Sequence, residues 1–222
     1  MPDLQVAIIP VTAFQQNCTV VFDQATHRAV VFDPGGEADR ILGFTSGQGL
    51  EVERILLTHG HLDHAGGAAE LQRMLNEQRE AASKPGVEIW GPDERDRFLL
   101  EQIEKQQAAL GLSGMANVTP DRWLAGGDAV ELGWARFDVL HCPGHTPGSV
   151  AYIEQAARFA IVGDVLFEGS VGRTDFAYCD PAALIEAIKT KLLPLGDDIT
   201  FIPGHGQTST FGEERRHNPY IR

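Results

Sequence analysis

Basic residues are scarce in this sequence of 222 residues, in which 18 lysines and arginines stand against 31 aspartates and glutamates, a formal net charge of −13. Proteins that bind a phosphate backbone or an anionic membrane surface do so through an excess of lysine and arginine. The charge balance therefore argues against nucleic acid and against a membrane surface as partners.

Cysteine is equally sparse. Cys18, Cys142 and Cys179 lie far apart and form no Cys-x-x-Cys pair, so the sequence predicts neither a disulfide framework nor a thiolate zinc site. No apolar run approaches the roughly 20 residues that span a bilayer. The first residues also lack the basic and apolar parts of a signal peptide. We therefore expect a cytoplasmic protein.

Apolar residues, 43% of the chain, come in short dense runs that end at Pro, Gly or Asp, which is typical of β-strands. The predicted strands are residues 6–9, 18–22, 29–32, 54–58, 87–90, 129–132, 136–140, 150–153, 159–162 and 199–202. Helical spacing marks residues 65–83 and 92–112, and Asp180-Pro181 begins a third helix.

In each half of the chain, several predicted strands come first, and a further strand paired with a helix follows them. This order predicts an α/β protein, an αββα sandwich in which two mixed sheets pack face to face with helices on the outside. No linker or low-complexity tract divides the sequence, so residues 1–222 are expected to form one domain.

Histidines gather where predicted strands end. The segment Thr58-His59-Gly60-His61-Leu62-Asp63-His64 directly follows a buried strand and precedes a helix. Imidazole and carboxylate groups in one short loop can converge on one point, and this ligand set suits zinc, iron or manganese rather than calcium or magnesium. Histidines scattered over the surface would show no such relation to strand ends.

Three later strand ends repeat the arrangement. His145 follows the strand 136–140, Asp164 follows 159–162, and His205 follows 199–202. The candidate metal ligands are therefore His59, His61, Asp63, His64, His145, Asp164 and His205. Seven ligands are too many for one tetrahedral zinc ion with an open position. Two metal ions that share one bridging carboxylate fit this inventory.

The order H-x-H-x-D-H, a lone His, a lone Asp and a last His resembles the signature of the metallo-β-lactamase superfamily. Residues 10–19, 32–36, 171–176 and 211–219 are similar to motifs of its glyoxalase II (hydroxyacylglutathione hydrolase) branch, most closely those of the short, single-domain bacterial glyoxalase II-like hydrolases. The resemblance covers essentially the whole chain and implies a metallo-β-lactamase fold.

The resemblance also implies a division of the ligands. His59, His61 and His145 would hold one divalent ion, Asp63, His64 and His205 would hold a second, and Asp164 would bridge the two. Zinc is the favoured metal for both ions, with iron or manganese as alternatives. Asp63 would in addition orient the metal-bound hydroxide.

Neighbouring residues take supporting roles in this interpretation. Asp33 matches an aspartate that supports the histidine loop in the family. His141, four residues before His145, is interpreted as a supporting or surface residue rather than a ligand. Cys142 is expected to be a buried structural thiol.

The implied activity is hydrolysis of a small-molecule thioester, S-lactoylglutathione or a related compound, to a carboxylic acid and a thiol. A metal-bound hydroxide would attack, so no Ser or Cys nucleophile is required. Full-length glyoxalase II has a C-terminal helical domain that contacts glutathione, whereas this sequence ends soon after His205. We therefore expect weaker recognition of the glutathione part.

Two alternative functions stay open. Persulfide dioxygenases of the same superfamily share the sequence of residues 172–176 and use a single iron ion. A non-catalytic metal-binding protein would not need both ligand sets intact. β-Lactamase activity is disfavoured because zinc-dependent lactamases commonly have Cys where Asp164 stands.

Residues 92–112 are interpreted as a partly exposed helix rather than a binding module. The sequence does not indicate an oligomeric state.

Overall fold

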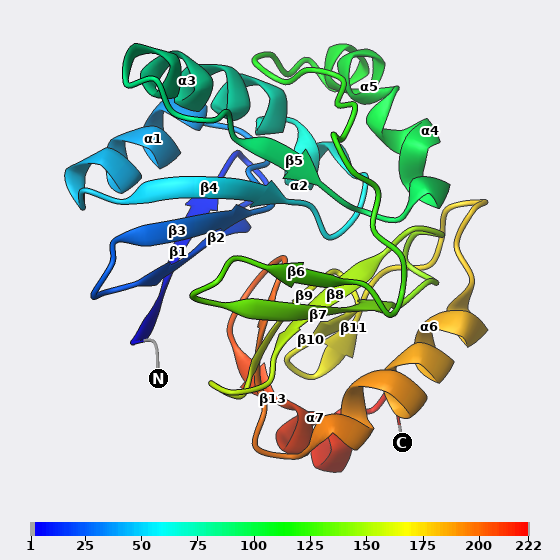
Figure 1. Ribbon diagram of the computed structural model, residues 1–222. Coiled ribbons are helices and arrows are strands. Elements are labelled where there is room, and N and C mark those ends of the chain that lie inside the picture. Colours follow the sequence, from blue (N-terminus) through cyan, green and yellow to red (C-terminus); the bar gives the residue numbers. More distant parts are fainter. Residues whose placement is uncertain (1–2, 222) are drawn as a thin grey trace.

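Two β-sheets face each other in the middle of the molecule, and helices cover their outer faces (Figure 1). The computed structural model describes residues 3–221. The five-stranded sheet has the order β1-β2-β3-β4-β5, and the six-stranded sheet has the order β13-β12-β9-β8-β7-β6. Each sheet mixes parallel and antiparallel pairs. The predicted αββα sandwich is confirmed.

The first sheet consists of β1 (Leu4–Val11), β2 (Gln16–Asp23), β3 (Arg28–Phe32), β4 (Glu51–Leu56) and β5 (Glu88–Trp90), covered by α1 (Ala38–Gly47) and α3 (Ala68–Ala81). The sequence did not predict α1. Gly43, Thr45 and Gly47 lower its helix propensity, and burial of Ile41 in the core beneath it stabilises the helix instead.

The second sheet consists of β6 (Ala129–Glu131), β7 (Arg136–His141), β8 (Val150–Glu154), β9 (Phe159–Gly163), β12 (Thr200–Pro203) and β13 (Ser209–Thr210). Its outer face is covered by α6 (Pro181–Ala187), which continues through η2 (Ile188–Leu192) and η3 (Leu193–Leu195), and by α7 (Phe211–His217). Asp180 caps α6 as predicted, because its side chain accepts the N–H of Ala183 at 3.0 Å. A small ribbon of β10 (Leu166–Phe167) and β11 (Ser170–Val171) follows β9.

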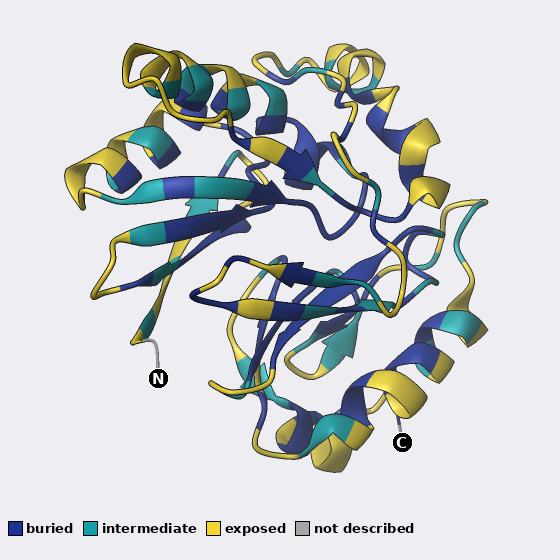
Figure 2. Cartoon of the chain, viewed as in Figure 1, coloured by how far each residue is buried: buried dark blue, intermediate teal, exposed yellow. Residues whose placement is uncertain are grey.

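Alternating strand residues build three apolar layers. On β3, Val31 packs under α1 and α3, whereas Phe32 faces the second sheet. On β8, Tyr152 meets Phe32 at 5.2 Å between ring centroids, whereas Ile153 packs with Leu184 of α6. This alternation follows from the two-residue period of a strand. The central strands β2, β3, β8 and β9 are therefore buried on both faces, as Figure 2 shows.

The two long predicted helices are interrupted. Residues 65–83 correspond to α2 (Leu62–Ala65) and α3, with Gly66 and Gly67 between them, and residues 92–112 form η1 (Glu94–Asp96), α4 (Arg97–Leu100) and α5 (Ile103–Ala109). Leu100 and Ile103 anchor this second segment in the core. Within residues 3–221, no helix combines the length and the apolar character needed to cross a membrane.

Candidate metal centre

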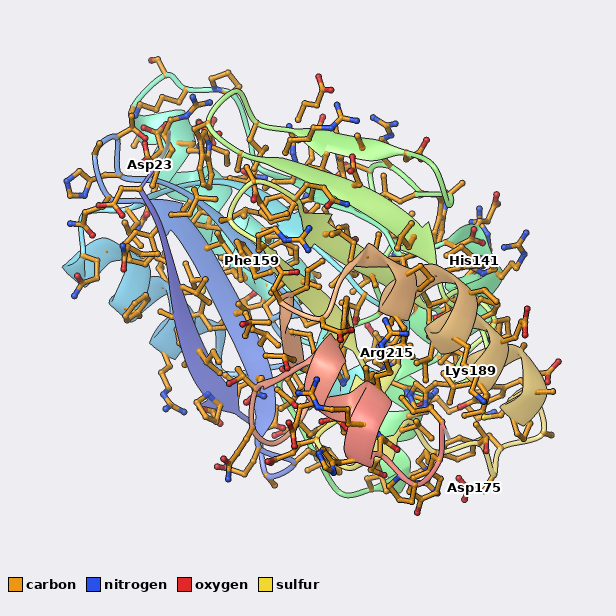
Figure 3. The ribbon with its side chains drawn as sticks, turned by 90° about the horizontal axis from the view of Figure 1, so that it is seen from below. Asp23, His141, Phe159, Asp175, Lys189 and Arg215 are labelled. Carbon is orange, nitrogen blue, oxygen red and sulfur yellow. The ribbon has the colours of Figure 1, made fainter. Side chains whose placement is uncertain are left out.

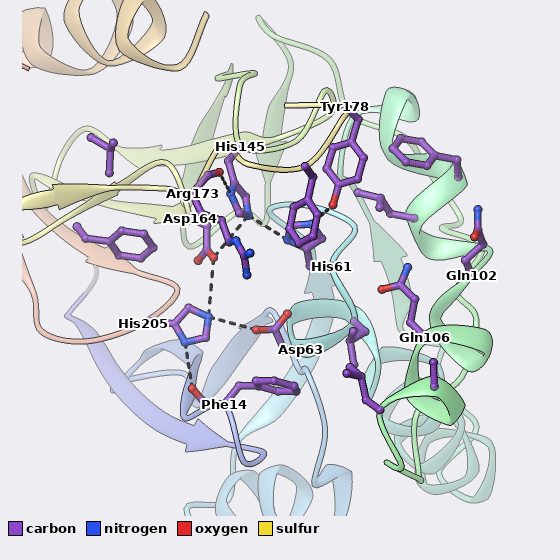
Figure 4. Close-up of a pocket in the computed structure, with 18 of the residues that line it drawn as sticks. Phe14, His61, Asp63, Gln102, Gln106, His145, Asp164, Arg173, Tyr178 and His205 are labelled. Atoms are coloured by element: carbon purple, nitrogen blue, oxygen red, sulfur yellow. Dashed lines mark hydrogen bonds and ion pairs between the residues drawn. The ribbon is translucent and has the colours of Figure 1, made fainter. Parts of the chain in front are cut away.

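The predicted ligands converge where strands of both sheets end. The loop of His59, His61, Asp63 and His64 follows β4, His145 lies in the loop after β7, Asp164 follows β9 directly, and His205 comes two residues after β12. Figure 4 shows the side chains of His61, Asp63, His145, Asp164 and His205 pointing toward one another. The structure thus brings together all seven residues that the sequence singled out.

His59, His61 and His145 form one group with metal-ligand spacing. His61 Nδ1 lies 3.0 Å from His59 Nε2 and 3.0 Å from His145 Nε2. Two nitrogen ligands of a tetrahedral zinc ion would be roughly 3.3 Å apart. The three inward nitrogens are therefore close to the separation that one shared cation requires.

The outward nitrogens of these imidazoles are each held by another group. His59 Nδ1 donates to Thr58 Oγ1 at 3.1 Å, His61 Nε2 is hydrogen-bonded to the Tyr178 hydroxyl at 2.8 Å, and His145 Nδ1 donates to the Arg173 carbonyl at 2.9 Å. Such partners fix ring orientation and tautomer in metal sites. They direct the lone pairs of His59 and His145 into the cluster.

Asp63, His64 and His205 form a second group. Asp63 Oδ2 lies 3.2 Å from His205 Nε2 and 4.0 Å from His64 Nε2. His64 Nδ1 lies 2.9 Å from Asp33 Oδ2, and His205 Nδ1 donates to the Phe14 carbonyl at 3.2 Å. The imidazole rings of His64 and His205 are thus oriented, like those of the first group, by hydrogen bonds on the side away from the cluster.

Asp164 stands between the two groups. Its Oδ1 lies 3.3 Å from His64 Nε2, and its Oδ2 lies 3.6 Å from His145 Nε2 and 3.8 Å from His205 Nε2. A Cβ added to Gly204 would come within 2.1 Å of Asp164 Oδ1, so only glycine allows the carboxylate this position. The geometry is that of a carboxylate able to contact two ions.

Burial and charge set the protonation states of these groups. Burial holds the pKa of His59 well below its usual value and lowers the pKa of His61 to about 3, so both are neutral imidazoles. Burial also lowers the pKa of His64, but the charges of Asp164 and Asp63 outweigh it and raise the pKa well above the usual value. A proton therefore occupies His64 when no other cation balances the two carboxylates.

Apart from the 3.3 Å contact between them, His64 Nε2 and Asp164 Oδ1 are two buried atoms of the centre that have no hydrogen-bond partner within residues 3–221. Unpartnered buried polar atoms are rare, and a bound ion is one recognised explanation. Neutral imidazole lone pairs beside paired carboxylates also match the ligand preferences of zinc, iron and manganese. The residues present therefore fit a pair of divalent cations.

Asp33 lies behind the histidines, as predicted. It could join a third group with His59 and His64 by distance alone. Its oxygens are already occupied, however, because Oδ1 accepts the Thr58 N–H at 2.7 Å and Oδ2 accepts the Thr58 hydroxyl at 2.6 Å and contacts His64 Nδ1. Asp33 thus acts as a support of the loop rather than as a free ligand.

His141 and Cys142 stay outside the centre. His141 lies at the tip of β7 (Figure 3), where its Nε2 donates to the Pro147 carbonyl at 2.8 Å. This contact braces the loop that carries His145. Cys142 is fully buried, and burial raises the pKa of its thiol to about 12. The thiol is therefore protonated at neutral pH and is a structural group, as expected.

Asp96 is a supporting residue that the sequence analysis missed. Its Oδ2 accepts the Gly60 N–H at 2.8 Å and the Thr146 hydroxyl at 2.6 Å, and its Oδ1 accepts the Gly148 N–H at 2.6 Å. One buried carboxylate thereby joins the loop of His59 to the loop of His145. Nothing in the sequence around residue 96 signals this role, because its partners lie far away in the chain.

Replacement of Asp96 by asparagine should loosen the centre without removing a ligand. Asp96 meets only donors, so an amide N–H₂ in its place would leave an unpaired buried donor. We expect the free energy of unfolding to fall by about 1–3 kcal/mol and metal affinity to fall roughly 10–100-fold. Chelator competition and denaturant unfolding would measure both, and wild-type metal retention would contradict the assigned role.

A cavity of about 930 Å³ opens directly onto the cluster. Asp63, Asp164 and His205 face it from one side, and residues of α4 and α5 form the opposite wall. The interpretation of residues 92–112 as a partly exposed helix was therefore incomplete. One side of this segment is exposed as expected, but another lines the space in front of the candidate ligands.

Comparison with known proteins agrees with this geometry. The family model of the metallo-beta-lactamase superfamily matches residues 11–205. The hydroxyacylglutathione hydrolase GloC of Haemophilus influenzae is 45% identical over 219 residues, which cover 98% of each chain.

Two solved structures are similar over nearly their whole length. The BLEG-1 B3 metallo-beta-lactamase has a TM-score of 0.84 at 32% identity and covers 98% of this chain and 99% of its own. TTHA1623 in a di-iron-bound form has a TM-score of 0.81 at 35% identity, with 96% of this chain and 99% of its own covered. With its fold, its histidine motif and these relatives, the chain belongs to the metallo-β-lactamase superfamily.

Proposed function

We propose that this metal-dependent hydrolase cleaves a thioester, S-lactoylglutathione or a close relative, at a dinuclear centre. The observation that supports two ions is the position of Asp164 between two complete ligand groups. His59, His61 and His145 would hold one ion, Asp63, His64 and His205 the other, with Asp164 shared. The named activity of the Haemophilus influenzae relative supports the thioester as substrate.

Two divalent ions bound there would activate water, polarise the thioester carbonyl and stabilise the departing thiolate. Asp63 is placed to orient the water. Burial raises the pKa of its carboxyl, but the charge of His64 outweighs this and keeps the pKa below its usual value. The carboxylate lines the cavity, so it can accept a hydrogen bond from the attacking water and direct it toward the carbonyl.

The rest of the centre provides fixed positions. The imidazoles of the first ligand group are fixed by hydrogen bonds on the side away from the cluster. Their partners are Thr58 for His59, Tyr178 for His61 and the Arg173 carbonyl for His145. A catalytic group held to within a few tenths of an ångström lowers the entropic part of the barrier. No cysteine or serine nucleophile is needed, which agrees with the buried, protonated thiol of Cys142.

Metal analysis together with a thioester hydrolysis screen tests this function. We expect close to two equivalents of zinc, iron or manganese and turnover of S-lactoylglutathione. One iron per chain together with oxygen uptake on glutathione persulfide would favour the dioxygenase alternative. Metal without turnover of any thioester would favour a non-catalytic metal-binding protein.

The intact second ligand group is the reason to prefer the hydrolase. A single iron ion could be held by histidines of the first group together with the Asp164 carboxylate, which would leave Asp63, His64 and His205 without a metal to bind. The interpretation of residues 1–222 as one domain and the cytoplasmic location stay predictions from the sequence.

A further inference from the structure

The wall opposite the metal centre comes from one side of α4 and α5. Phe98, Leu99, Gln102, Gln106 and Leu110 line the cavity there. Phe98 and Leu99 belong to α4, Gln106 belongs to α5, and Gln102 and Leu110 lie at the two ends of α5. Both short helices therefore turn one side toward the cavity. Phe98 is 36% exposed and Leu110 58% exposed, so large apolar side chains remain accessible on this wall. Apolar surface with a few polar groups is the usual lining of a small-molecule site.

The two glutamines of this wall have unused amides. Neither the Gln102 nor the Gln106 side chain makes a hydrogen bond to any residue within 3–221, and Figure 4 shows both on the cavity wall. Gln107 provides the contrast. Its Nε2 donates to the Met115 carbonyl at 2.5 Å and its Oε1 accepts the Met115 N–H at 2.9 Å. Gln107 therefore holds the fold, whereas Gln102 and Gln106 can bind a ligand.

Away from the metal centre, the wall of the cavity has little positive charge for an anionic ligand. Among its lining residues within the described part of the chain, Arg173 is the one arginine and lysine is absent. Arg173 is already paired with Asp175, with Nε to Oδ1 and Nη2 to Oδ2 both at 2.6 Å. A ligand carboxylate would thus have to displace this pair. The wall favours neutral groups that both donate and accept hydrogen bonds.

We propose that the wall of α4 and α5 binds the thiol half of the thioester, with Gln102 and Gln106 pairing with its secondary amides. This inference rests on the proposed function. A three-carbon hydroxyacyl group is small, whereas a cavity of about 930 Å³ lies at the upper end of the range for drug-sized ligands, roughly 300–1,000 Å³. The larger thiol half is therefore the part that can reach the wall.

The substrate class follows from this pairing. It comprises thioesters whose thiol carries one or more amides close to the sulfur, and terminal carboxylates contribute little to binding. Each glutamine amide has both a donor and an acceptor, which complements the N–H and C=O of a secondary amide. A tripeptide thiol and a simpler amide thiol should therefore both be bound, and a thiol without an amide should be bound less well.

Steady-state kinetics on three lactoyl thioesters test the proposal, with glutathione, N-acetylcysteamine and 2-mercaptoethanol as the thiols. For the wild type, KM should be similar for the first two and higher for the third. The double variant Gln102→Leu/Gln106→Leu should raise KM for the two amide thioesters about 10-fold or more, as expected for two lost neutral hydrogen bonds. The double variant should then no longer prefer the two amide thioesters over the 2-mercaptoethanol thioester.

Lys105 provides the matched control, since it is exposed on the same helix but does not line the cavity. Lys105→Ala should leave all three KM values unchanged. A higher KM for S-lactoylglutathione in this variant, or a KM that rises with salt as charges are screened, would show recognition of carboxylates and overturn the proposal. An unchanged amide preference in the double variant would overturn it as well.

The outcomes separate this inference from the proposed function. Hydrolysis of all three thioesters by the wild type, with no effect of the glutamine substitutions, would refute only the thiol-binding wall. Failure of the wild type to hydrolyse any of them, with its metal content intact, would refute the thioesterase itself. The metal content and unfolding midpoint of the double variant report whether a change in KM reflects misfolding.

Discussion

Asp164→Ala is expected to lower the metal content of the purified protein from two ions per chain to one or none and to abolish hydrolysis. Asp164 is the carboxylate whose two oxygens face both ligand groups, and no other carboxylate of the cluster can reach both. The loss in kcat should therefore exceed the roughly 10–100-fold typical of residues behind the ligands. Elemental analysis and initial rates on S-lactoylglutathione measure the two effects.

The variant Asp164→Asn separates charge from shape. It nearly preserves the side-chain volume in the tight space beside Gly204 but removes the negative charge, so it should also lose metal and activity. Asp39→Asn is the matched control, because Asp39 is exposed in the first turn of α1. Full metal occupancy with normal turnover in both Asp164 variants would refute the bridging role.

His145→Ala should collapse activity, whereas His141→Ala should cause a loss of about 10–100-fold or less. His141 ends β7 and His145 lies in the loop that follows, and the two histidines have different surroundings. His145 Nε2 lies 3.0 Å from His61 Nδ1 inside the cluster, whereas His141 hydrogen-bonds the Pro147 carbonyl outside it. The comparison of kcat and metal content between the two variants therefore tests which histidine is the ligand.

A third histidine calibrates this comparison. His27 is exposed and has a φ of 58°, so asparagine, which tolerates this backbone region, is the suitable replacement. His27→Asn should behave as wild type. If His141→Ala lost more metal than His145→Ala, the ligand assigned to the loop after β7 would be wrong by four residues.

The sequence predicted the convergence of the seven candidate ligands because each of them directly follows a strand or lies in a short loop beside one. His59 to His64 form a local motif, and the ends of neighbouring strands bring Asp164 and His205 to the same place. The continuous apolar runs at residues 29–32 and 150–153 likewise agree with the predicted sandwich, in which the opposite sheet and the outer helices cover the two faces of each sheet. These features depend on short-range patterns, which a sequence displays directly.

Features that depend on tertiary placement could not be predicted. Asp96 acts through Gly60, Thr146 and Gly148, and no local pattern distinguishes it from Asp93, three residues earlier in the sequence. Gln106 and Gln107 are neighbours in the sequence, yet one faces the cavity and the other holds the loop at Met115. Helix α1 was missed because its stability comes from Ile41 in the core rather than from its own composition.

The origin of the ligands in both sheets has a consequence for the lifetime of the protein. Ions bound between residue 59 and residue 205 would join parts of the chain that drift far apart once it unfolds, so they would bind the folded state much more tightly than the unfolded chain. Each would then add stability by mass action, about 2.7 kcal/mol at a free-ion concentration 100 times Kd. In a metal-poor cell the same chain would unfold more often, and proteases would remove it faster.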